Sequence, residues 1–215
     1  MIIAIDGPAG SGKTTTARKV AMSLGFIHIN TGAMYRGIAL KFIREKVNLN
    51  DALAIGIILK NTILDFAGPD LGSLYMDGEN ISAEITSSLV TENVSQISAI
   101  SEVRVKLVEY QRQMALGNNV VLEGRDIGTV VFPNANYKFY LVADIKVRAE
   151  RRKKELEAKG ERISMEEVIL FLKDRDQKDS SRELSPLLKA EDAIELDTTE
   201  LSIEEQVNYI INFVN

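Results

Sequence analysis

A glycine-rich loop between an apolar run and a helix-forming stretch constrains this chain more than any other feature. One residue, Asp6, separates the run Ile2–Ile5 from a loop with the pattern G-x-x-x-x-G-K-T. Glycines let such a loop curl its N–H groups around phosphate oxygens, and the N-terminus of the following helix adds positive charge. The loop therefore predicts a nucleoside triphosphate site. The residues assigned to it are Gly7, Pro8, Ala9, Gly10, Ser11, Gly12, Lys13, Thr14 and Thr15.

Side chains in and around this loop carry specific expectations. We expect Lys13 to reach the β- and γ-phosphates and the Thr14 hydroxyl to join the coordination of Mg²⁺. Asp6 either orients a water on that ion or caps the strand end, and the sequence favours neither. The single histidine, His28, is expected to have a core or surface role, because phosphoryl transfer to an anionic acceptor needs no histidine base.

The composition excludes several classes of protein. A chain of 215 residues fits one domain, or a core with a small inserted unit. It has no cysteine, which rules out disulfides and thiolate metal sites and suits a reducing compartment. Without a basic leader or an apolar run long enough to span a membrane, we expect a soluble cytoplasmic protein. The net charge of −5 argues against broad binding to nucleic acid.

Alternating strand and helix patterns predict an α/β fold. Strands are expected at 2–5, 26–29, 119–122, 137–142 and 194–196, and crossover helices between them make the strands parallel. We expect Gly25 to end the first helix and Thr31 to cap the second. Helices are also expected over 91–116, with a break near Ser101, and over 145–159, 164–181 and 202–214. The pattern predicts a three-layer fold in which helices cover both faces of a five-stranded parallel sheet.

Residues 61–90 interrupt this alternation. Segments 63–66, 73–76 and 80–82 are typical of short strands, and Asp77-Gly78 is typical of a hairpin turn. We interpret this segment as a small β-rich insert in a core formed by residues 1–60 and 91–215. The segment 65–68 also matches the D-x-x-G of switch GTPases, but the chain has no N-K-x-D and so short a motif is expected by chance.

Polar segments follow three of the predicted core strands. Ligands of open parallel sheets bind beyond the carboxyl ends of the strands, so the phosphate loop, residues 30–36 and residues 123–126 are expected to line one crevice. Arg36 alone would suit an exposed helix surface equally well. Arg125 and Asp126 follow a glycine at the end of a buried strand, which favours a functional loop.

The two charged helices place arginines at helical spacing. These are Arg148, Arg151 and Arg152 on the first, with Arg175, Asp179 and Arg182 on and just after the second. A charge run usually forms a solvated, ion-paired surface. These helices, however, follow a strand whose end must lie near the triphosphate, and arginine suits forked contacts with phosphate. We therefore favour a mobile arginine-bearing lid over about residues 148–185.

Longer stretches resemble the bacterial cytidylate kinases, a family of nucleoside monophosphate kinases. The matching stretches are IDGPAGSGK at 5–13, TGAMYR at 31–36 and GRDIGTVVFP at 124–133, together with Arg175-Asp176, Arg182 and SPL at 185–187. The resemblance covers nearly the whole chain. It implies transfer of the γ-phosphoryl of ATP to the 5′-phosphate of CMP or dCMP with Mg²⁺, in pyrimidine nucleotide metabolism. It also implies that the insert belongs to the monophosphate-binding unit and that the charged helices close over the site.

The resemblance further implies a role for individual residues. Ser95, Arg104 and Asp126 would read the cytosine, whereas Thr31, Arg36, Arg125 and Arg182 would hold the acceptor phosphate and Arg175 and Asp179 the sugar. Lys13, Arg125 and Arg182 would carry the catalytic charge, with weaker phosphate contacts from the arginines of the first charged helix. Two positions depart from the family pattern, since Asn30 and Glu123 stand where aspartate is usual, which affects local hydrogen bonding at the strand ends.

Two other functions remain open on the residues alone. One is a small-molecule kinase that acts on AMP, UMP or a non-nucleotide such as shikimate. The other is a nucleotide-dependent switch, against which the missing N-K-x-D and the two arginine-bearing helices argue. The partners we expect are small molecules, and the absence of a heptad seam or a large apolar stripe favours a monomer.

Overall fold

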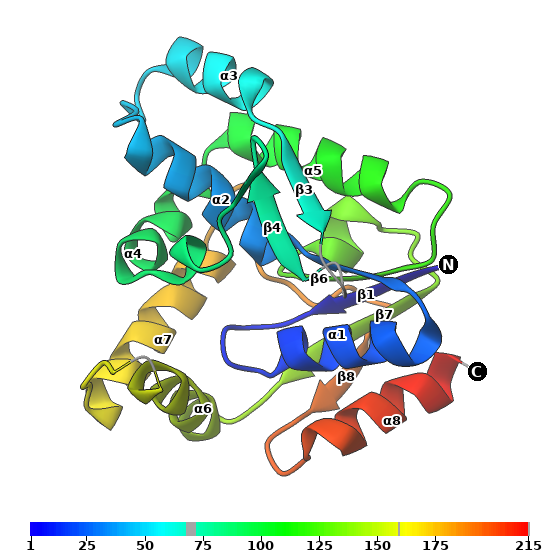
Figure 1. Cartoon of the computed structure of the whole chain (residues 1–215). Coiled ribbons are helices and arrows are strands. Elements are labelled where there is room, and N and C mark those ends of the chain that lie inside the picture. Colours follow the sequence, from blue (N-terminus) through cyan, green and yellow to red (C-terminus); the bar gives the residue numbers. More distant parts are fainter. Residues whose placement is uncertain (68–71, 159, 215) are drawn as a thin grey trace.

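A parallel sheet of five strands lies at the centre of the computed structural model, which describes residues 1–67, 72–158 and 160–214 (Figure 1). The strand order is β2 (Ile27–Asn30), β6 (Val120–Gly124), β1 (Ile2–Asp6), β7 (Tyr137–Val142) and β8 (Ile194–Asp197). Every neighbouring pair is parallel. The predicted parallel sheet and its five strands are confirmed, with boundaries shifted by no more than two residues.

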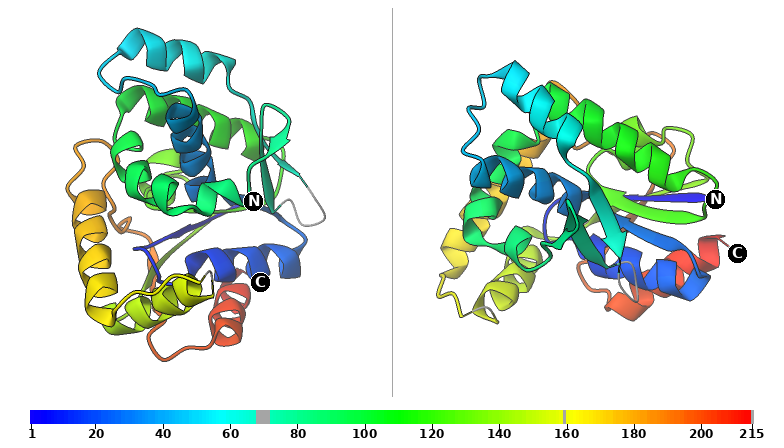
Figure 2. Two further views of the ribbon diagram at one scale, coloured as in Figure 1. Left: turned by 60° about the vertical axis from the view of Figure 1, so that its left-hand side comes forward. Right: turned by 45° about the horizontal axis from the view of Figure 1, so that its top comes forward.

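Helices cover both faces of this sheet, which makes the predicted three-layer fold (Figure 2). On one face, Ile3 and Ile5 of β1 pack in a buried cluster with α1 (Lys13–Leu24) and α8 (Ile203–Val214). On the other face, Ala4 packs in a cluster with α2 (Thr31–Arg44) and α5 (Ser101–Ala115). Successive strand residues point to opposite faces, so β1 needs apolar residues at every position between Ile2 and Ile5.

Local capping signals were predicted with mixed success. Gly25 ends α1 in the left-handed region, with φ 67°, as expected of a helix C-cap. The prediction that Thr31 caps α2 is wrong. Asn30 is the N-cap, and its side chain accepts a hydrogen bond from the Ala33 N–H at 2.9 Å. The amide found where the family pattern has aspartate therefore fulfils the capping role, which frees the Thr31 hydroxyl for another contact.

The remaining helices follow the prediction except for one. Helices α4 (Ser88–Ile97) and α5 are separated near Ser101, and the charged helices are α6 (Ile145–Glu157) and α7 (Met165–Ser180). The residue at position 159, at the predicted end of α6, lies outside the described residues. Helix α3 (Ala52–Asn61) was not predicted. It begins at an Asp51 cap and exposes Leu53 and Ile57, so its apolar residues do not form one clear stripe.

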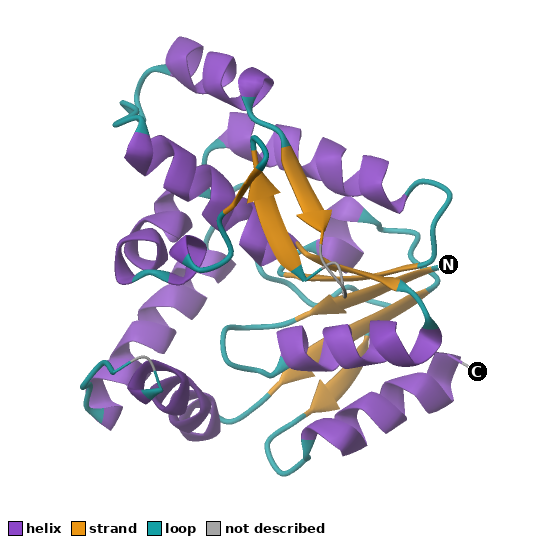
Figure 3. Ribbon diagram, viewed as in Figure 1, coloured by secondary structure: helices purple, strands orange, loops and turns teal. Residues whose placement is uncertain are grey.

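Residues 61–90 contain a second, smaller sheet, which lies beside α2 (Figure 3). Strands β3 (Leu64–Ala67), β4 (Ser73–Met76) and β5 (Glu79–Asn80) pair antiparallel, and a short 3₁₀ turn, η1 (Glu84–Thr86), follows. Asp77 and Gly78 have φ values of 53° and 86°, which confirms the predicted hairpin turn. The D-x-x-G match reaches position 68, outside the described residues.

The small sheet shares its core with the main fold. Leu64, Leu74 and Ile81 belong to the same buried cluster as Ile38 of α2. A Cβ at Gly37 would lie 3.1–3.3 Å from side chains of the small sheet and the segment after it, so any larger residue there requires these side chains to shift.

Among the described helices, none is both long enough and apolar enough to cross a membrane.

Candidate active site

The phosphate loop connects β1 to α1 and turns through two left-handed glycines. Gly10 has φ 76° and Gly12, the residue before α1, has φ 90°. Lys13 begins the helix, and its Nζ donates a hydrogen bond to the Pro8 carbonyl at 3.0 Å. The side chain is buried, and this burial lowers the pKa of Lys13 to about 7, an effect to which the nearby Arg125 adds.

The end of β6 brings a buried carboxylate to the start of α1. Glu123 is 3 % exposed, its Oε2 accepts a hydrogen bond from the Thr14 hydroxyl at 2.8 Å, and its backbone carbonyl accepts one from Thr31 Oγ1 at 2.7 Å. Its Oε1 has no hydrogen-bond partner among the described residues and lies 3.8 Å from His28 Nε2. Burial lowers the pKa of His28, and of the core and surface positions expected for this residue the structure shows the core one.

Asp6 fixes the segment that follows β6. Its two carboxylate oxygens accept hydrogen bonds from the N–H groups of Ile127 and Gly128, at 2.9 and 2.8 Å. These residues begin η2 (Ile127–Val131), a π-helical turn that was not predicted. Burial raises the pKa of Asp6 to about 6, although the two N–H groups act in the opposite direction. Of the two roles considered for Asp6, its contacts favour the cap.

Two adjoining cavities open at the carboxyl ends of the strands. The larger one is lined by the phosphate loop together with Arg36, Arg151 and Arg152, and the smaller one by Ser95, Arg104, Asp126, Asp179 and Arg182. Gly32, Gly124, Arg125 and Arg175 line both cavities. The three strand-end segments therefore meet at one crevice, as the sequence predicts.

A buried ion pair lies in the wall of the smaller cavity. Arg104, from α5, donates a hydrogen bond to Asp126, and both side chains are almost fully buried. Arg104 also donates to the Ser98 carbonyl at 3.2 Å, and its guanidinium lies 5.4 Å from the centre of the Tyr35 ring. Ser95 lines the same cavity from α4. The arrangement presents a hydroxyl, a guanidinium and a carboxylate beside one another.

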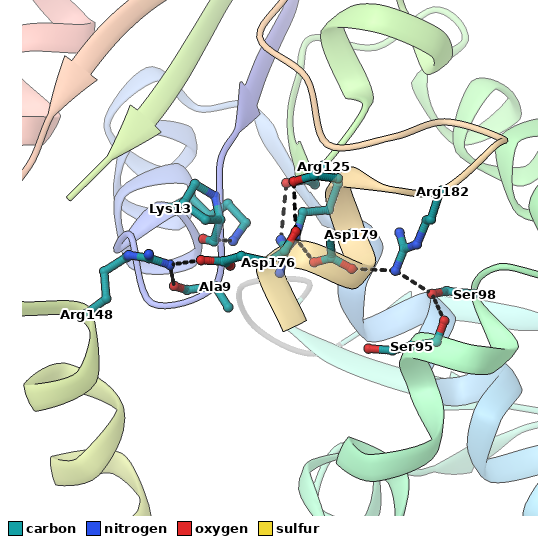
Figure 4. Close-up of polar contacts among 12 residues, drawn as sticks. Ala9, Lys13, Ser95, Ser98, Arg125, Arg148, Asp176, Asp179 and Arg182 are labelled. Carbon is teal, nitrogen blue, oxygen red and sulfur yellow. Dashed lines mark hydrogen bonds and ion pairs between the residues drawn. The ribbon is translucent and has the colours of Figure 1, made fainter. Parts of the chain in front are cut away.

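Asp179 lies between two arginines at the junction of the cavities. Its Oδ2 accepts a hydrogen bond from Arg125 Nε at 2.8 Å, and its Oδ1 accepts one from Arg182 (Figure 4). Arg182 also donates to the Ser98 hydroxyl at 2.9 Å. Burial acts to raise the pKa of Asp179, but the adjacent Arg125 and Arg182 hold it below its ordinary value. The carboxylate thus neutralises two of the cations expected to bind phosphate.

Two further arginines line the larger cavity without a carboxylate partner in the described part of the chain. Arg36 donates to the Ile85 carbonyl and to the Thr91 hydroxyl, at 3.0 and 2.9 Å, both neutral acceptors. The Nε of Arg175 is buried and has no hydrogen-bond partner among the described residues. Burial, together with neighbouring arginines, lowers the pKa of Arg36 to about 10 and that of Arg175 to about 9. Excess positive charge of this kind favours the binding of an anion.

The arginines of α6 divide between two environments. Arg151 and Arg152 line the larger cavity, where Arg151 donates to the Thr198 carbonyl and Arg152 pairs with Glu155. Arg148 does not line either cavity, because it is buried against the backbone of the phosphate loop. Helical spacing alone predicted that all three arginines face the phosphates. In the structure Arg151 and Arg152 face the larger cavity, and Arg148 does not.

Sequence reasoning missed Tyr35 and Ser98 as residues of the site. Both line the smaller cavity. Ser98 lies three residues after Ser95, and Tyr35 precedes Arg36 within the TGAMYR stretch, so spacing could have indicated both. Ser98 contacts Arg104, six residues away in the sequence, and Arg182, 84 residues away. The second contact depends on the fold.

Comparison with known proteins identifies the family. The family model for cytidylate kinase matches residues 3–215. The chain belongs to the cytidylate kinase family. It is 48% identical over 208 residues to a cytidylate kinase of Caldanaerobacter subterraneus subsp. tengcongensis, covering 97% of this chain and 92% of that protein. It is 46% identical over 212 residues to a cytidylate kinase of Desulforamulus reducens, covering 99% of this chain and 96% of that protein.

Solved structures support the fold assignment. A shikimate kinase from Bacteroides thetaiotaomicron superposes with a TM-score of 0.51 at 10% identity, covering 100% of this chain and 98% of that one. An uncharacterized protein from Eubacterium ventriosum superposes with a TM-score of 0.54 at 12% identity and the same coverage. At such identities the likeness concerns the fold alone, which is an α/β architecture.

Proposed function

We propose that this chain transfers the γ-phosphoryl group of ATP to the 5′-phosphate of CMP and dCMP, which yields CDP and dCDP. The observation that carries the proposal is the buried Arg104–Asp126 pair in a cavity that shares four lining residues with the cavity of the phosphate loop. Membership of the cytidylate kinase family supports the same reaction. This reaction requires a triphosphate site and an adjoining site that recognises the base.

We assign recognition of the base to the smaller cavity. Cytosine offers an amino donor at N4 and acceptors at N3 and O2, so its edge needs a carboxylate on one side and donors on the other. Asp126 supplies the carboxylate, and Ser95 and Arg104 supply donors from two different helices. All three line that cavity. A uracil would present a carbonyl oxygen to the carboxylate, so its binding is expected to be weaker.

We assign the acceptor phosphate to Arg36, Arg125, Arg182 and Thr31, and the sugar to Arg175 and Asp179. Phosphoryl transfer depends on positioning two anions in line and on offsetting their repulsion. Lys13, Arg125 and Arg182 supply the positive charge for this step, and Arg151 and Arg152 line the larger cavity from α6. The acceptor phosphate is already a nucleophile, which explains why no poised general base is required.

The residues beside the phosphate loop fit a magnesium ion. Mg²⁺ is typically bound by few protein oxygens together with water and substrate phosphates. The Thr14 hydroxyl would hold it, assisted by Glu123, whose Oε1 is buried without a hydrogen-bond partner in the described chain. When bound, the ion would neutralise phosphate charge and orient the β- and γ-phosphates.

We extend the proposal to the organisation of the chain. Residues 61–90 would form the β-rich part of the monophosphate-binding unit, and residues 148–185 a helical lid that excludes water during transfer. We further propose a monomer that acts in the cytoplasm on free nucleotides rather than on nucleic acid. The net charge of −5 supports the last point.

Phosphorus NMR of a mixture of Mg·ATP and CMP tests the reaction directly. The proposal expects resonances of CDP and ADP to grow together as those of ATP and CMP decline. Growth of ADP with inorganic phosphate, and with CMP unchanged, would instead indicate hydrolysis and would contradict the proposal.

A further inference from the structure

Arg148 lies where the phosphate loop, the end of β7 and α7 meet. From the first turn of α6, its Nε donates to the Ala143 carbonyl at 3.1 Å, and its Nη1 donates to the Ala9 carbonyl at 3.1 Å. The same nitrogen pairs with the carboxylate of Asp176 in α7 at 2.6 Å (Figure 4). The Arg148 side chain is 9 % exposed. A planar guanidinium that is buried and bonded on three sides holds its partners in a defined geometry.

The phosphate loop also contacts this pair of helices in two other ways. Ala9 belongs to a buried apolar cluster that includes Ala149 of α6 and Leu172 of α7. A Cβ at Gly10 would lie 3.1 Å from both the Cβ and the carbonyl oxygen of Arg148, so the loop and α6 approach as closely as glycine permits. The ion pair is therefore part of a packed junction, in which a shift of α7 is transmitted to the loop.

Helix α7 carries residues of the smaller cavity immediately beside this junction. Asp176 follows Arg175 and precedes Asp179 by one turn. Arg175 and Asp179 both line that cavity. The Oδ1 of Asp176 is buried without a hydrogen-bond partner among the described residues, so Arg148 is the contact that fixes this carboxylate. Neither Arg148 nor Asp176 lines either cavity. Both are thus placed to act through their neighbours.

We propose that the Arg148–Asp176 pair couples the two substrate sites. The pair holds α7, and with it Arg175 and Asp179, in register with the phosphate loop. Binding of ATP at the loop therefore strengthens the binding of CMP, and by thermodynamic linkage CMP strengthens the binding of ATP to the same extent. The inference rests on the proposed function, and it makes both members of the pair positioning residues rather than phosphate ligands.

The coupling is measured as the change in CMP affinity caused by a non-hydrolysable ATP analogue. Titration calorimetry gives the dissociation constant of CMP with and without the analogue for the parent chain, Arg148→Gln, Asp176→Asn and the double variant. We expect the analogue to tighten CMP binding about fivefold or more in the parent chain, a typical coupling between sites. In each variant this factor is expected to fall below about twofold, and the double variant should lose no more than either single one.

Matched variants separate coupling from general damage. Asp174→Asn breaks an exposed ion pair with Lys178 on the same helix and is expected to keep the parent coupling. Asp176→Glu keeps the negative charge and is expected to retain most of the coupling. Thermal unfolding establishes that each variant is folded, and if Arg148→Gln is not, the partly exposed Asp176→Asn carries the test alone.

Undiminished coupling in folded Asp176→Asn, or an equal loss in Asp174→Asn, would overturn the inference. Failure of the parent chain to bind CMP at all would count against the proposed function instead.

Discussion

The carboxylate of Asp179 accepts a hydrogen bond from the guanidinium of Arg125 at 2.8 Å, although 54 residues separate the two in sequence. Arg125 follows the end of β6 and Asp179 lies in the last turn of α7, so this ion pair joins the sheet to the second charged helix. In the chain without substrate, a carboxylate thus lies beside cations assigned to the acceptor phosphate. An incoming phosphate has to share those cations with Asp179.

The first prediction concerns this competition. Asp179→Asn removes the negative charge from Arg125 and Arg182 but keeps a side chain of similar size. Because the two arginines are then unneutralised, we expect inorganic phosphate to bind more tightly, by about tenfold for the loss of one close charge partner. Turnover of CMP should fall, since the sugar contact is weakened. Titration calorimetry with inorganic phosphate checks the first effect, and weaker phosphate binding in the variant would contradict it.

Base reading by Asp126 gives a second prediction. Asp126→Ala should lower kcat/KM for CMP by about 100-fold, because a buried hydrogen-bonding site that loses its partner costs several kcal/mol. The dissociation constant of ATP should change by less than about threefold, since Asp126 lines only the smaller cavity. Removal of the whole side chain in Asp126→Ala leaves the buried Arg104 without a partner. Asp126→Asn therefore serves as a second variant, because its amide oxygen can still accept a hydrogen bond from Arg104. Equal losses for CMP and ATP would remove the base-reading role.

A third prediction follows from the pKa of Lys13, which burial lowers to about 7. Phosphate oxygens of ATP favour the charged ammonium, so binding at pH 8 should take up a proton, whereas binding at pH 6 should not. The affinity for ATP should therefore decrease as pH rises above 7. Calorimetry in two buffers of different ionisation enthalpy measures the uptake. Lys13→Arg, which stays protonated, should show none, and the same uptake in that variant would assign the proton to another group.

The same shift sets the sign of the effect of Lys13 on stability. The unfolded chain keeps this proton up to pH 10.5, whereas the folded chain releases it above about pH 7. The cost of burying the ammonium is therefore fully present below pH 7 and is relieved as pH rises toward 10.5. Lys13→Ala should leave the melting temperature unchanged or raised at pH 6, while lowering kcat by about 100-fold or more. A variant with near-normal turnover would contradict the catalytic role.

A fifth prediction tests how the small sheet is attached. Gly37→Leu should destabilise the chain by about 1–3 kcal/mol, because a larger side chain at this close contact must displace Leu74 or Ile81. The matched control is Gly56→Ala in α3, where a Cβ meets open space, and which should stabilise by up to about 1 kcal/mol. Urea unfolding gives both values. An unchanged free energy of unfolding for Gly37→Leu would mean that the small sheet can move away from α2 without loss of stability, which would contradict the prediction.

The sequence allowed accurate prediction wherever one local signal determined the structure. The phosphate loop, the left-handed Gly25 and the Asp77-Gly78 turn each depend on the conformational freedom of glycine, which sequence displays directly. Buried strands such as β1 are visible as continuous apolar runs. The prediction for Thr31 was wrong because Asn30 and Thr31 are adjacent residues that both favour N-caps, and only the structure shows which one does so.

Features that depend on distant contacts could not be predicted in this way. The π-helical turn at Ile127 exists beside Asp6, a residue 121 positions away in sequence. Helix α3 packs two buried residues, Ile55 and Leu59, but its other apolar residues blur the periodicity, so its Asp51 cap was the remaining signal. The spacing of Arg148 indicates the face on which it lies, but not that this face meets the phosphate loop.

ADP production from Mg·ATP with a panel of acceptors tests the kinase reaction and the base-reading site together. The panel comprises CMP, dCMP, UMP, AMP, shikimate and no acceptor, each compared by kcat/KM. We predict strong turnover with CMP and dCMP, and at least about 100-fold less with the others, as a site built around specific hydrogen bonds requires. Preference for another acceptor would contradict the assignments of Ser95, Arg104 and Asp126, and equal ADP release without any acceptor would contradict the kinase reaction itself.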